Sequence, residues 1–211
     1  MQRLINSYPR QIAIHYRIQF GEESKFWDYI NKNNGTRTLF YSVYSPDING
    51  KFDKVIIDKL FFDFDEELER NYTIDDALSD VKKLSNYLLE QNIKHLLLYS
   101  GKKGFHLYII AKNGDKLKYS KESLNNAHHY FINKLNISPD RHPVGDIARV
   151  ARIPNSWHLS GKKFCIPISK EDLELGMEHI KNKARQQQFN FVYYGNEEFD
   201  IGKYDYKSSN N

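Results

Sequence analysis

The stretch LFFDFDEELE, residues 60–69, places two aspartates, Asp63 and Asp65, in a run of leucine and phenylalanine. With the apolar residues before it, it predicts a strand over residues 55–65 that ends at the aspartates. Alternate residues of a strand share a face, so both carboxylates leave one face and the neighbouring phenylalanines leave the other. Two carboxylates at this spacing raise each other's pKa unless a cation lies between them. Taken alone, the stretch is compatible with a divalent-metal site and with an exposed acidic strand end.

A second polar stretch, YSGKKGFH at residues 99–106, lies between two predicted strands. Its two glycines permit a tight turn and a close approach of the backbone to a ligand. The turn brings together a hydroxyl, two cations and an imidazole, from Ser100, Lys102, Lys103 and His106. Backbone N–H groups in such a turn can bind an anion while the lysines supply charge. The pattern indicates phosphate binding, but an ordinary hairpin turn with solvated lysines has the same composition.

The third stretch, GDIARVARIPNSWHLSGKK at residues 145–163, is expected to be irregular. Asp146 is a candidate third carboxylate ligand, and Arg149 and Arg152 are candidates to clamp phosphate. His158 follows a Pro-Asn turn. Taken alone, this is also the composition of a basic surface loop. Together, three carboxylates, a Gly/Lys/His turn and an Arg/His loop suit two-metal nucleotidyl transfer on a triphosphate.

The remaining patterns predict a fold that mixes strands and helices. Apolar runs and alternation predict strands at residues 11–20, 37–45, 95–100, 105–111, 164–168 and 189–194. Helical spacing predicts helices at residues 22–32, 73–91, 121–135 and 170–187. A capping box opens the second of these helices at Thr73. Since strands and helices do not alternate strictly, a mixed-sheet α+β or α/β fold is favoured over a doubly wound parallel sheet.

The composition limits the class of protein. The formal net charge of +4 over 211 residues permits a polyanionic partner without requiring one. The single cysteine, Cys165, excludes an intrachain disulfide framework and a cysteine-based structural zinc site. No apolar run approaches the ~20 residues that span a bilayer, and the first residues lack the apolar core of a secretion signal. We therefore expect a cytoplasmic protein in a reducing compartment, without membrane contacts.

The order and the residue patterns of the three stretches resemble the motifs of the catalytic subunits of archaeo-eukaryotic primases, of the small-subunit or primase-polymerase type. FFDFD resembles the first motif of that family, a hydrophobic strand that ends in Asp-x-Asp. SGKKGFH resembles the second motif, Ser-Gly-basic-basic-Gly-x-His. DIARVARIPNSWHLSGKKFCIPI resembles the third, in which an Asp and a basic-x-Pro-x-x-x-His element lead into a basic hairpin and a strand. The resemblance covers about residues 60–168.

This resemblance implies an α+β (mixed α/β) fold with the archaeo-eukaryotic primase catalytic core. An N-terminal αβ part, about residues 1–55, would pack on an RRM-like part, about residues 56–195, that has a mixed or antiparallel sheet. The two parts would form a single primase-polymerase catalytic domain over residues 1–195. A polar C-terminal tail would follow at residues 196–211.

The resemblance also implies roles for individual side chains. The residues expected to hold two divalent ions, Mg²⁺ or Mn²⁺, are Asp63, Asp65 and Asp146. The residues expected to bind the triphosphate of the incoming nucleotide are Ser100, Lys102, Lys103, His106, Arg152 and His158. Arg10 is expected to be a further nucleotide contact, and Lys162 a contact to the template DNA. The spacing from Asp146 to Arg152 is shorter than in cellular eukaryotic members and nearer to compact archaeal, plasmid or viral forms.

These roles predict a template-directed nucleotidyltransferase that synthesises primers on single-stranded DNA from nucleoside triphosphates. A large primase subunit, a helicase or a further C-terminal domain is a candidate partner. Two alternatives stay open. One is a repair-type polymerase of the same family that only extends primers. The other is a non-catalytic nucleic-acid-binding module of replication.

Overall fold

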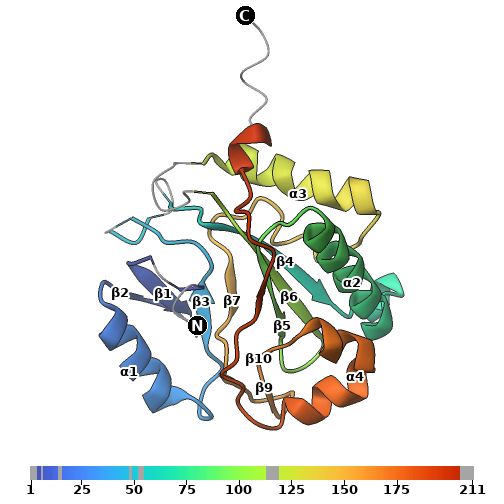
Figure 1. Ribbon diagram of the computed structural model, residues 1–211. Coiled ribbons are helices and arrows are strands. Elements are labelled where there is room, and N and C mark those ends of the chain that lie inside the picture. Colours follow the sequence, from blue (N-terminus) through green and yellow to red (C-terminus); the bar gives the residue numbers. More distant parts are fainter. Residues whose placement is uncertain are drawn as a thin grey trace, which may run out of the picture.

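Two antiparallel sheets form the centre of the molecule, and helices lie outside them (Figure 1). The computed structural model describes residues 4–5, 7–13, 16–47, 49–51, 55–112 and 119–204. None of the helices described is both long and apolar enough to cross a membrane.

The first sheet has the strand order β2-β1-β3-β7. Its strands are β1 (Arg10–Ala13), β2 (Arg17–Phe20), β3 (Phe40–Ser42) and β7 (Val150–Arg152). Helix α1 (Glu23–Asn33) packs on this sheet through the edge-to-face contact of Phe26 with Phe20. Strand β7 comes from much later in the chain, and Phe40 lies opposite Arg152. The third polar stretch therefore completes the sheet of the N-terminal part.

The single strand predicted over residues 11–20 is wrong, because this segment forms the two antiparallel strands β1 and β2. Ile12 lies opposite Ile18, so the chain reverses between them. Tyr16, at the reversal, is 64% exposed. Apolar alternation alone does not distinguish one long strand from a tight hairpin when Gly and Pro are absent from the turn.

The second sheet has the order β10-β5-β6-β4, and β11 also pairs with β5. Its strands are β4 (Lys59–Asp65), β5 (His95–Tyr99), β6 (Gly104–Ile110), β10 (Ile166–Pro167) and β11 (Tyr193–Tyr194). Strand β4 pairs with β6 over its full length, with Asp63 opposite His106 and Asp65 opposite Gly104. The first two polar stretches are thus neighbours in one sheet.

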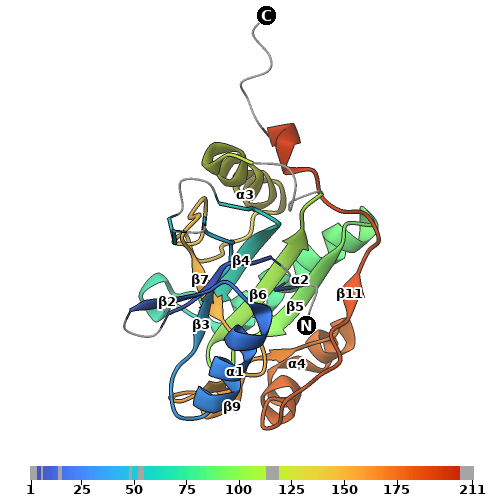
Figure 2. The same cartoon turned by 90° about the vertical axis from the view of Figure 1, so that its left-hand side faces the viewer.

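Helices α2 (Ile74–Glu90) and α3 (Lys121–Leu135) cover one face of the second sheet, and α4 (Lys170–Lys183) packs beside α2 (Figures 1 and 2). The predicted capping box is present at the start of α2, where Thr73 and Asp76 bond each other's backbone N–H. Helix α4 is interrupted at Gly176, whose φ of 84° is not helical. The helices predicted at residues 73–91 and 121–135 are confirmed.

Strand β4 separates an apolar face from a polar one, as its alternation predicts. Phe62 stacks edge-to-face on His128 and Phe131 of α3, so the even-numbered side chains pack into the helical layer. The odd-numbered positions face the other way, and there Phe61 packs against His106. Asp63 follows Phe61 on this face, and its residue is only 7% exposed. The fold therefore buries this aspartate on the side away from the helices.

A buried cluster of charges joins the first sheet to the start of β4. The guanidinium of Arg10 donates hydrogen bonds to the carbonyls of Ser42 and Val43 and to Asp58 Oδ2. Lys59 Nζ lies 2.7 Å from the other oxygen of Asp58. Burial lowers the pKa of Lys59 to about 8, although the Asp58 carboxylate opposes this shift. The cluster satisfies these charges inside the protein and fixes β4 against the first sheet.

Residues 196–204, expected to begin a polar tail, pack against the body of the protein. Ile201 is fully buried, and Asn126 of α3 donates a hydrogen bond to the carbonyl of Tyr204. The ring of Phe199 contacts Phe131 of α3. Folded structure therefore extends past the expected boundary at residue 195, because apolar side chains are interspersed among the polar ones.

Candidate active site

A cavity of about 250 Å³ lies where the two sheets meet, and side chains from both sheets line it. It brings together eight of the residues to which the resemblance assigns roles: Asp63, Asp65, Ser100, Lys102, Lys103, His106, Arg152 and His158. Arg149, the other candidate phosphate clamp of the third stretch, also lines it, and Phe40, Val150 and Ala151 complete the lining. The three polar stretches, separated by up to about ninety residues in the chain, therefore form one site.

Asp63 is the most deeply placed acid of this site. Its Oδ2 accepts a hydrogen bond from Arg149 Nη2 at 3.1 Å. Its Oδ1 has no hydrogen bond within the described part of the chain, and His106 Nε2 is 3.7 Å away. Burial, the largest cause, raises the pKa of Asp63 to about 6, although Arg149 acts against this shift. The positive charge of Arg149 therefore offsets only part of the cost of burying the charged carboxylate.

Asp65 lies on the same face of β4, two residues further along the strand and at its end. Its Oδ2 forms an ion pair with Lys103 Nζ at 3.2 Å. Burial and the neighbouring charge of Asp63 raise the pKa of Asp65 to about 6. Both acids thus have raised pKa values, chiefly because they are buried, and a neighbouring carboxylate adds to each shift, Asp140 for Asp63 and Asp63 for Asp65.

The turn between β5 and β6 approaches β4 so closely that only glycine fits at Gly104. A Cβ atom there would collide with the carbonyl oxygen of Phe64 and with the carboxylate of Asp65. The turn is closed by a hydrogen bond from Ser100 N to the Gly104 carbonyl at 2.9 Å. The absence of a side chain at this position allows Lys103 to lie beside Asp65.

His106 and Arg152 are buried polar groups on opposite walls of the cavity. Burial lowers the pKa of His106 to about 3, so its imidazole is neutral at physiological pH. The guanidinium of Arg152 lies 4.6 Å from the ring centroid of Phe40, its partner across the β3–β7 pairing. This stacking holds the cation in position while leaving its N–H groups to bind an anion.

A small hairpin of β8 (Trp157–His158) and β9 (Lys163–Phe164) carries His158 to the cavity. Gly161, in the turn of this hairpin, contacts the carbonyl of Gly101. Burial and the nearby charges of Arg152 and Lys102 lower the pKa of His158 to about 4. The N–H of Gly161 donates to Nδ1 of this neutral ring, which leaves the ring proton on Nε2 as a donor.

Five polar atoms in the lining residues are buried and have no hydrogen-bond partner among the described residues. They are Asp63 Oδ1, Ser100 Oγ, His106 Nδ1, Arg149 Nε and Arg152 Nη1. Buried polar groups are normally paired, and each exception calls for an explanation. Their concentration around one cavity indicates a polar ligand that pairs with them.

The structure does not bring Asp146 to this cavity. The Asp146 carboxylate instead accepts a hydrogen bond from the backbone N–H of Ala148 at 2.9 Å, as in a tight turn. Asp140, which the sequence analysis did not single out, does not line the cavity either, but it lies next to the aspartate strand. Its N–H donates to the carbonyl of Asp63 at 2.8 Å, and its Oδ2 lies 3.5 Å from Arg149 Nη2, the group that bonds Asp63. The spacing from Asp140 to Arg152 is also longer than the spacing from Asp146 to Arg152, which was short for this family.

Two further predicted residues lie outside the cavity. Arg10 is fully buried in the charge cluster with Asp58, where backbone carbonyls also occupy its guanidinium. Arg10 is not among the residues that line the cavity, and its contact to a nucleotide stays a prediction. Lys162 is exposed in the turn between β8 and β9, where its N–H donates to the carbonyl of His158. Its contact to template DNA stays a prediction.

The acids of this site suit a hard divalent cation. Among the described residues, no cluster of three His, Cys, Asp or Glu side chains is arranged to hold a metal ion. Mg²⁺ and Mn²⁺, however, need only one or two protein carboxylates, and take their other ligands from water and substrate phosphates. Asp63 and Asp65 supply two carboxylates, and the buried, unpaired Oδ1 of Asp63 is a free acceptor. The donor set therefore fits such an ion.

The fold has counterparts among solved structures. No protein-family model matches the sequence, and no curated protein matches it significantly. The polymerase domain of Ligase D from Mycobacterium tuberculosis, solved in complex with DNA, has a TM-score of 0.54 and 11% sequence identity, covering 82% of this chain and 69% of that chain. The AEP (archaeo-eukaryotic primase) domain of the primase-polymerase from cyanophage S-2L has a TM-score of 0.52 and 11% identity, covering 96% of this chain and 91% of that chain. The chain has the archaeo-eukaryotic primase-polymerase fold.

The fold expected from the primase-like motifs is thus confirmed. At 11% identity the similarity to each primase-polymerase structure concerns the fold alone. What this domain does chemically must be argued from the side chains in its own cavity.

Proposed function

We propose that this chain is a DNA-directed nucleotidyltransferase of the primase-polymerase type, which synthesises primers on a single-stranded DNA template. The observation that carries the proposal is the cavity between the sheets. In it, two buried carboxylates, whose negative charge is only partly neutralised by neighbouring cations, lie opposite cationic and neutral hydrogen-bond donors. These groups come from three separate segments of the chain. This is the arrangement that a nucleoside triphosphate and its divalent ions require.

Asp63 and Asp65, with Asp140 beside them, would hold the divalent ions. Such an ion, when bound, activates the attacking hydroxyl and neutralises charge on the phosphates. Arg149 now offsets the charge of Asp63 and Asp140, and Lys103 that of Asp65. These cations become available to phosphate oxygens when the carboxylates gain other partners.

The opposite wall of the cavity would bind the triphosphate. Arg152, fixed by its stacking on Phe40, offers a planar set of N–H donors that matches phosphate oxygens. His158 offers its Nε2 proton, and Ser100 offers a buried hydroxyl that has no partner in the described chain. The neutral donors orient the phosphates without adding to the net charge, while Lys102 and Arg152 stabilise charge that develops on them.

Incorporation of labelled nucleotides on unprimed single-stranded DNA tests this function. The assay uses both ribo- and deoxynucleoside triphosphates with Mg²⁺ or Mn²⁺. We expect Asp63→Asn, Asp65→Asn and Asp140→Asn each to reduce incorporation by at least about 100-fold, since each removes a carboxylate that would hold the divalent ions. Asp146→Asn is the matched control and should keep incorporation within about threefold, because its carboxylate only caps a turn.

Circular dichroism of each variant establishes that the protein is folded. Full incorporation by Asp63→Asn and Asp65→Asn would contradict the assignment of the site. A second arm supplies a primed template. Activity on that template alone would replace primer synthesis with primer extension, and DNA binding without incorporation in either arm would favour a non-catalytic module.

A further inference from the structure

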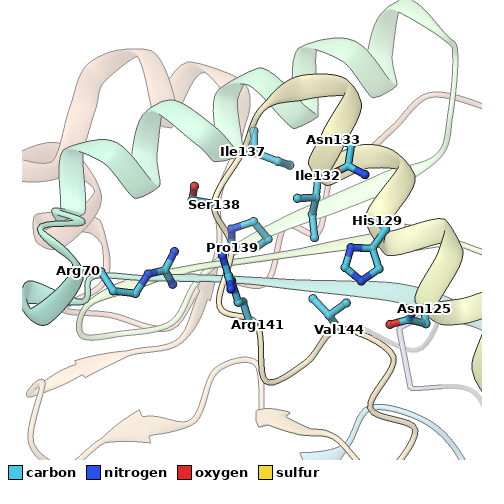
Figure 3. A pocket seen from close by; sticks show the side chains of 10 residues that line it. All are labelled: Arg70, Asn125, His129, Ile132, Asn133, Ile137, Ser138, Pro139, Arg141 and Val144. Atoms are coloured by element: carbon cyan, nitrogen blue, oxygen red, sulfur yellow. The ribbon is translucent and has the colours of Figure 1, made fainter.

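A second hollow, of about 490 Å³, lies between α3 and the segment of residues 137–144 (Figure 3). Ile132 and Ile137 give it an apolar wall. Its polar side chains are Arg70, Asn125, His129, Asn133, Ser138 and Arg141. In Figure 3, Arg70 and Arg141 lie toward one side of the hollow, and His129 and Asn125 toward the other. The proposed nucleotidyl transfer does not use any of these residues.

This hollow continues along α3 into another of about 530 Å³, because His129 and Asn133 line both. The second is also lined by Tyr130 and Lys134. We call the two hollows together the α3 groove, defined by Arg70, Asn125, His129, Asn133, Lys134 and Arg141. Over its described lining the groove has no Asp or Glu. Its charge is therefore positive, and its polar atoms include amides that can bond to bases.

Several of these side chains have unused hydrogen-bonding capacity. Within the described residues, the side chains of Asn133, His129 and Arg141 form no hydrogen bond or ion pair. Arg70 pairs with Glu67 at 2.9 Å and is exposed, so its guanidinium can also meet a ligand. The groove thus presents donors and acceptors around an apolar wall.

The α3 groove is connected to the catalytic cavity through the segment between them. Pro139 and Arg141 line the groove. Asp140, between them, faces the other way, with its N–H bonded to the Asp63 carbonyl and its carboxylate near Arg149. A ligand in the groove would therefore lie on the other side of this segment from Asp140 and the acids that would hold the divalent ions.

We propose that the α3 groove binds a segment of the single-stranded DNA template next to the catalytic cavity; this inference rests on the proposed function. The arginines and Lys134 would bind phosphates, the amides and His129 would bond to base edges, and the apolar wall and Tyr130 would contact base faces. Each hollow has the volume of a site for one small ligand, which suits successive nucleotides of one strand.

Fluorescence anisotropy with a labelled oligothymidylate tests the proposal. Binding is measured for the full chain in EDTA without nucleotide, so that neither metal nor triphosphate contributes. The double variant Arg70→Gln/Arg141→Gln should weaken binding roughly tenfold and reduce the slope of log K against log salt by about 1.4, the loss of two phosphate contacts to a single strand. Arg185→Gln, an exposed arginine outside both hollows, is the matched control and should change neither quantity.

A photocrosslinking residue at Asn133 locates the strand independently of affinity. It should crosslink to the oligothymidylate, whereas the same residue at exposed Glu178 of α4 should not. Unchanged affinity in the double variant, together with no crosslink from position 133, overturns the α3 groove as a DNA site. Loss of binding in a protein that shows no nucleotide incorporation would retain the groove and reject the proposed function, so the two failures are distinguishable.

Discussion

Asp63 costs the protein stability in the absence of a ligand. A carboxylate this deeply buried prefers to bind a proton, and its pKa is raised to about 6 mainly by burial. The ion pair with Arg149, at 3.1 Å, offsets part of this loss of stability. Proteins keep such groups where they meet a substrate or an ion, because the same lack of compensation attracts the missing charge.

Asp63→Asn should stabilise the metal-free protein at pH 7.5, by on the order of 2 kcal/mol. The folded-state pKa of about 6 lies above the unfolded value, so the contribution of Asp63 to stability is lost as pH rises from 4 to 6, and the stability of Asp63→Asn relative to wild type should increase through that window. Urea unfolding in EDTA at pH 4.5 and 7.5 measures both effects.

The exposed residue Asp28 provides the control for this experiment, since Asp28→Asn should leave the pH dependence of stability unchanged. If Asp63→Asn were less stable than wild type at pH 7.5, the Arg149 ion pair would outweigh burial, contrary to our expectation. Magnesium should favour wild type over the variant, because ligands that bind only the folded state stabilise it.

Strand alternation was sufficient to predict which face Asp63 and Asp65 share, but no local pattern could show that Asp140, and not Asp146, bonds to the aspartate strand. Both precede the Arg/His stretch, and both lie in a loop. The choice depends on the path of that loop, which is set by the bond from Asp140 N to the Asp63 carbonyl, a contact across 77 positions in the chain. Such a contact has no periodicity that a sequence can display.

At the scale of elements, the β5–β6 turn works through the absence of a side chain. Gly104→Ala should destabilise the protein by about 2 kcal/mol or more, because the added Cβ meets backbone and the strand pairing must shift. For a chain of this size that corresponds to a fall in Tm of at least about 5 °C. Incorporation should fall as well, since the turn carries Lys103 beside Asp65.

Gly21→Ala is the matched control for the turn. Nothing lies within 4 Å of a Cβ at this position, so its Tm should stay within about 1 °C of wild type. Scanning calorimetry of the two variants decides the question. Equal melting temperatures for both would show that the turn relaxes freely and that its close approach to β4 is not required.

Elements with strong local signals were predictable, and the shortest ones were not. The capping box and the apolar spacing predict helix α2, and helix α3 has the predicted bounds 121–135. Strands β7, β8 and β9 have only two or three residues each, too few for alternation to be recognised. They form because partners elsewhere in the chain supply the hydrogen bonds, as β3 does for β7.

At the scale of the whole molecule, the buried cluster of Arg10, Asp58 and Lys59 ties the two sheets together. Arg10→Met should destabilise the protein by about 3 kcal/mol, because the change leaves buried acceptors at Ser42, Val43 and Asp58 without a donor. Urea unfolding measures this loss.

The exposed residue Arg37 serves as the control, and Arg37→Met should be near neutral. Affinity for nucleoside triphosphate, measured below the unfolding transition, should be unchanged in Arg10→Met. A selective loss of that affinity at wild-type stability would instead restore Arg10 as a nucleotide contact and contradict its structural role.

The assembly of the site from two sheets was only partly visible in the sequence. The motif order indicated the fold and eight of the cavity's residues. The expected boundary near residue 55, between the N-terminal part and the RRM-like part, did not include the return of residues 150–152 to the N-terminal sheet. This return places Arg152 opposite Phe40 and so closes the cavity from the second side.

Strand β4 ends the second sheet, so one side of its backbone faces no further strand. A Phe-rich border of that kind is open to pairing with another polypeptide, which leads to aggregation. Here the outward carbonyl of Phe61 lies 3.0 Å from His128 Nε2, and the next one, of Asp63, accepts from Asp140 N. The hydrogen bond that brings Asp140 next to the acids therefore also occupies an outward carbonyl at the border of the sheet, where another strand could otherwise pair.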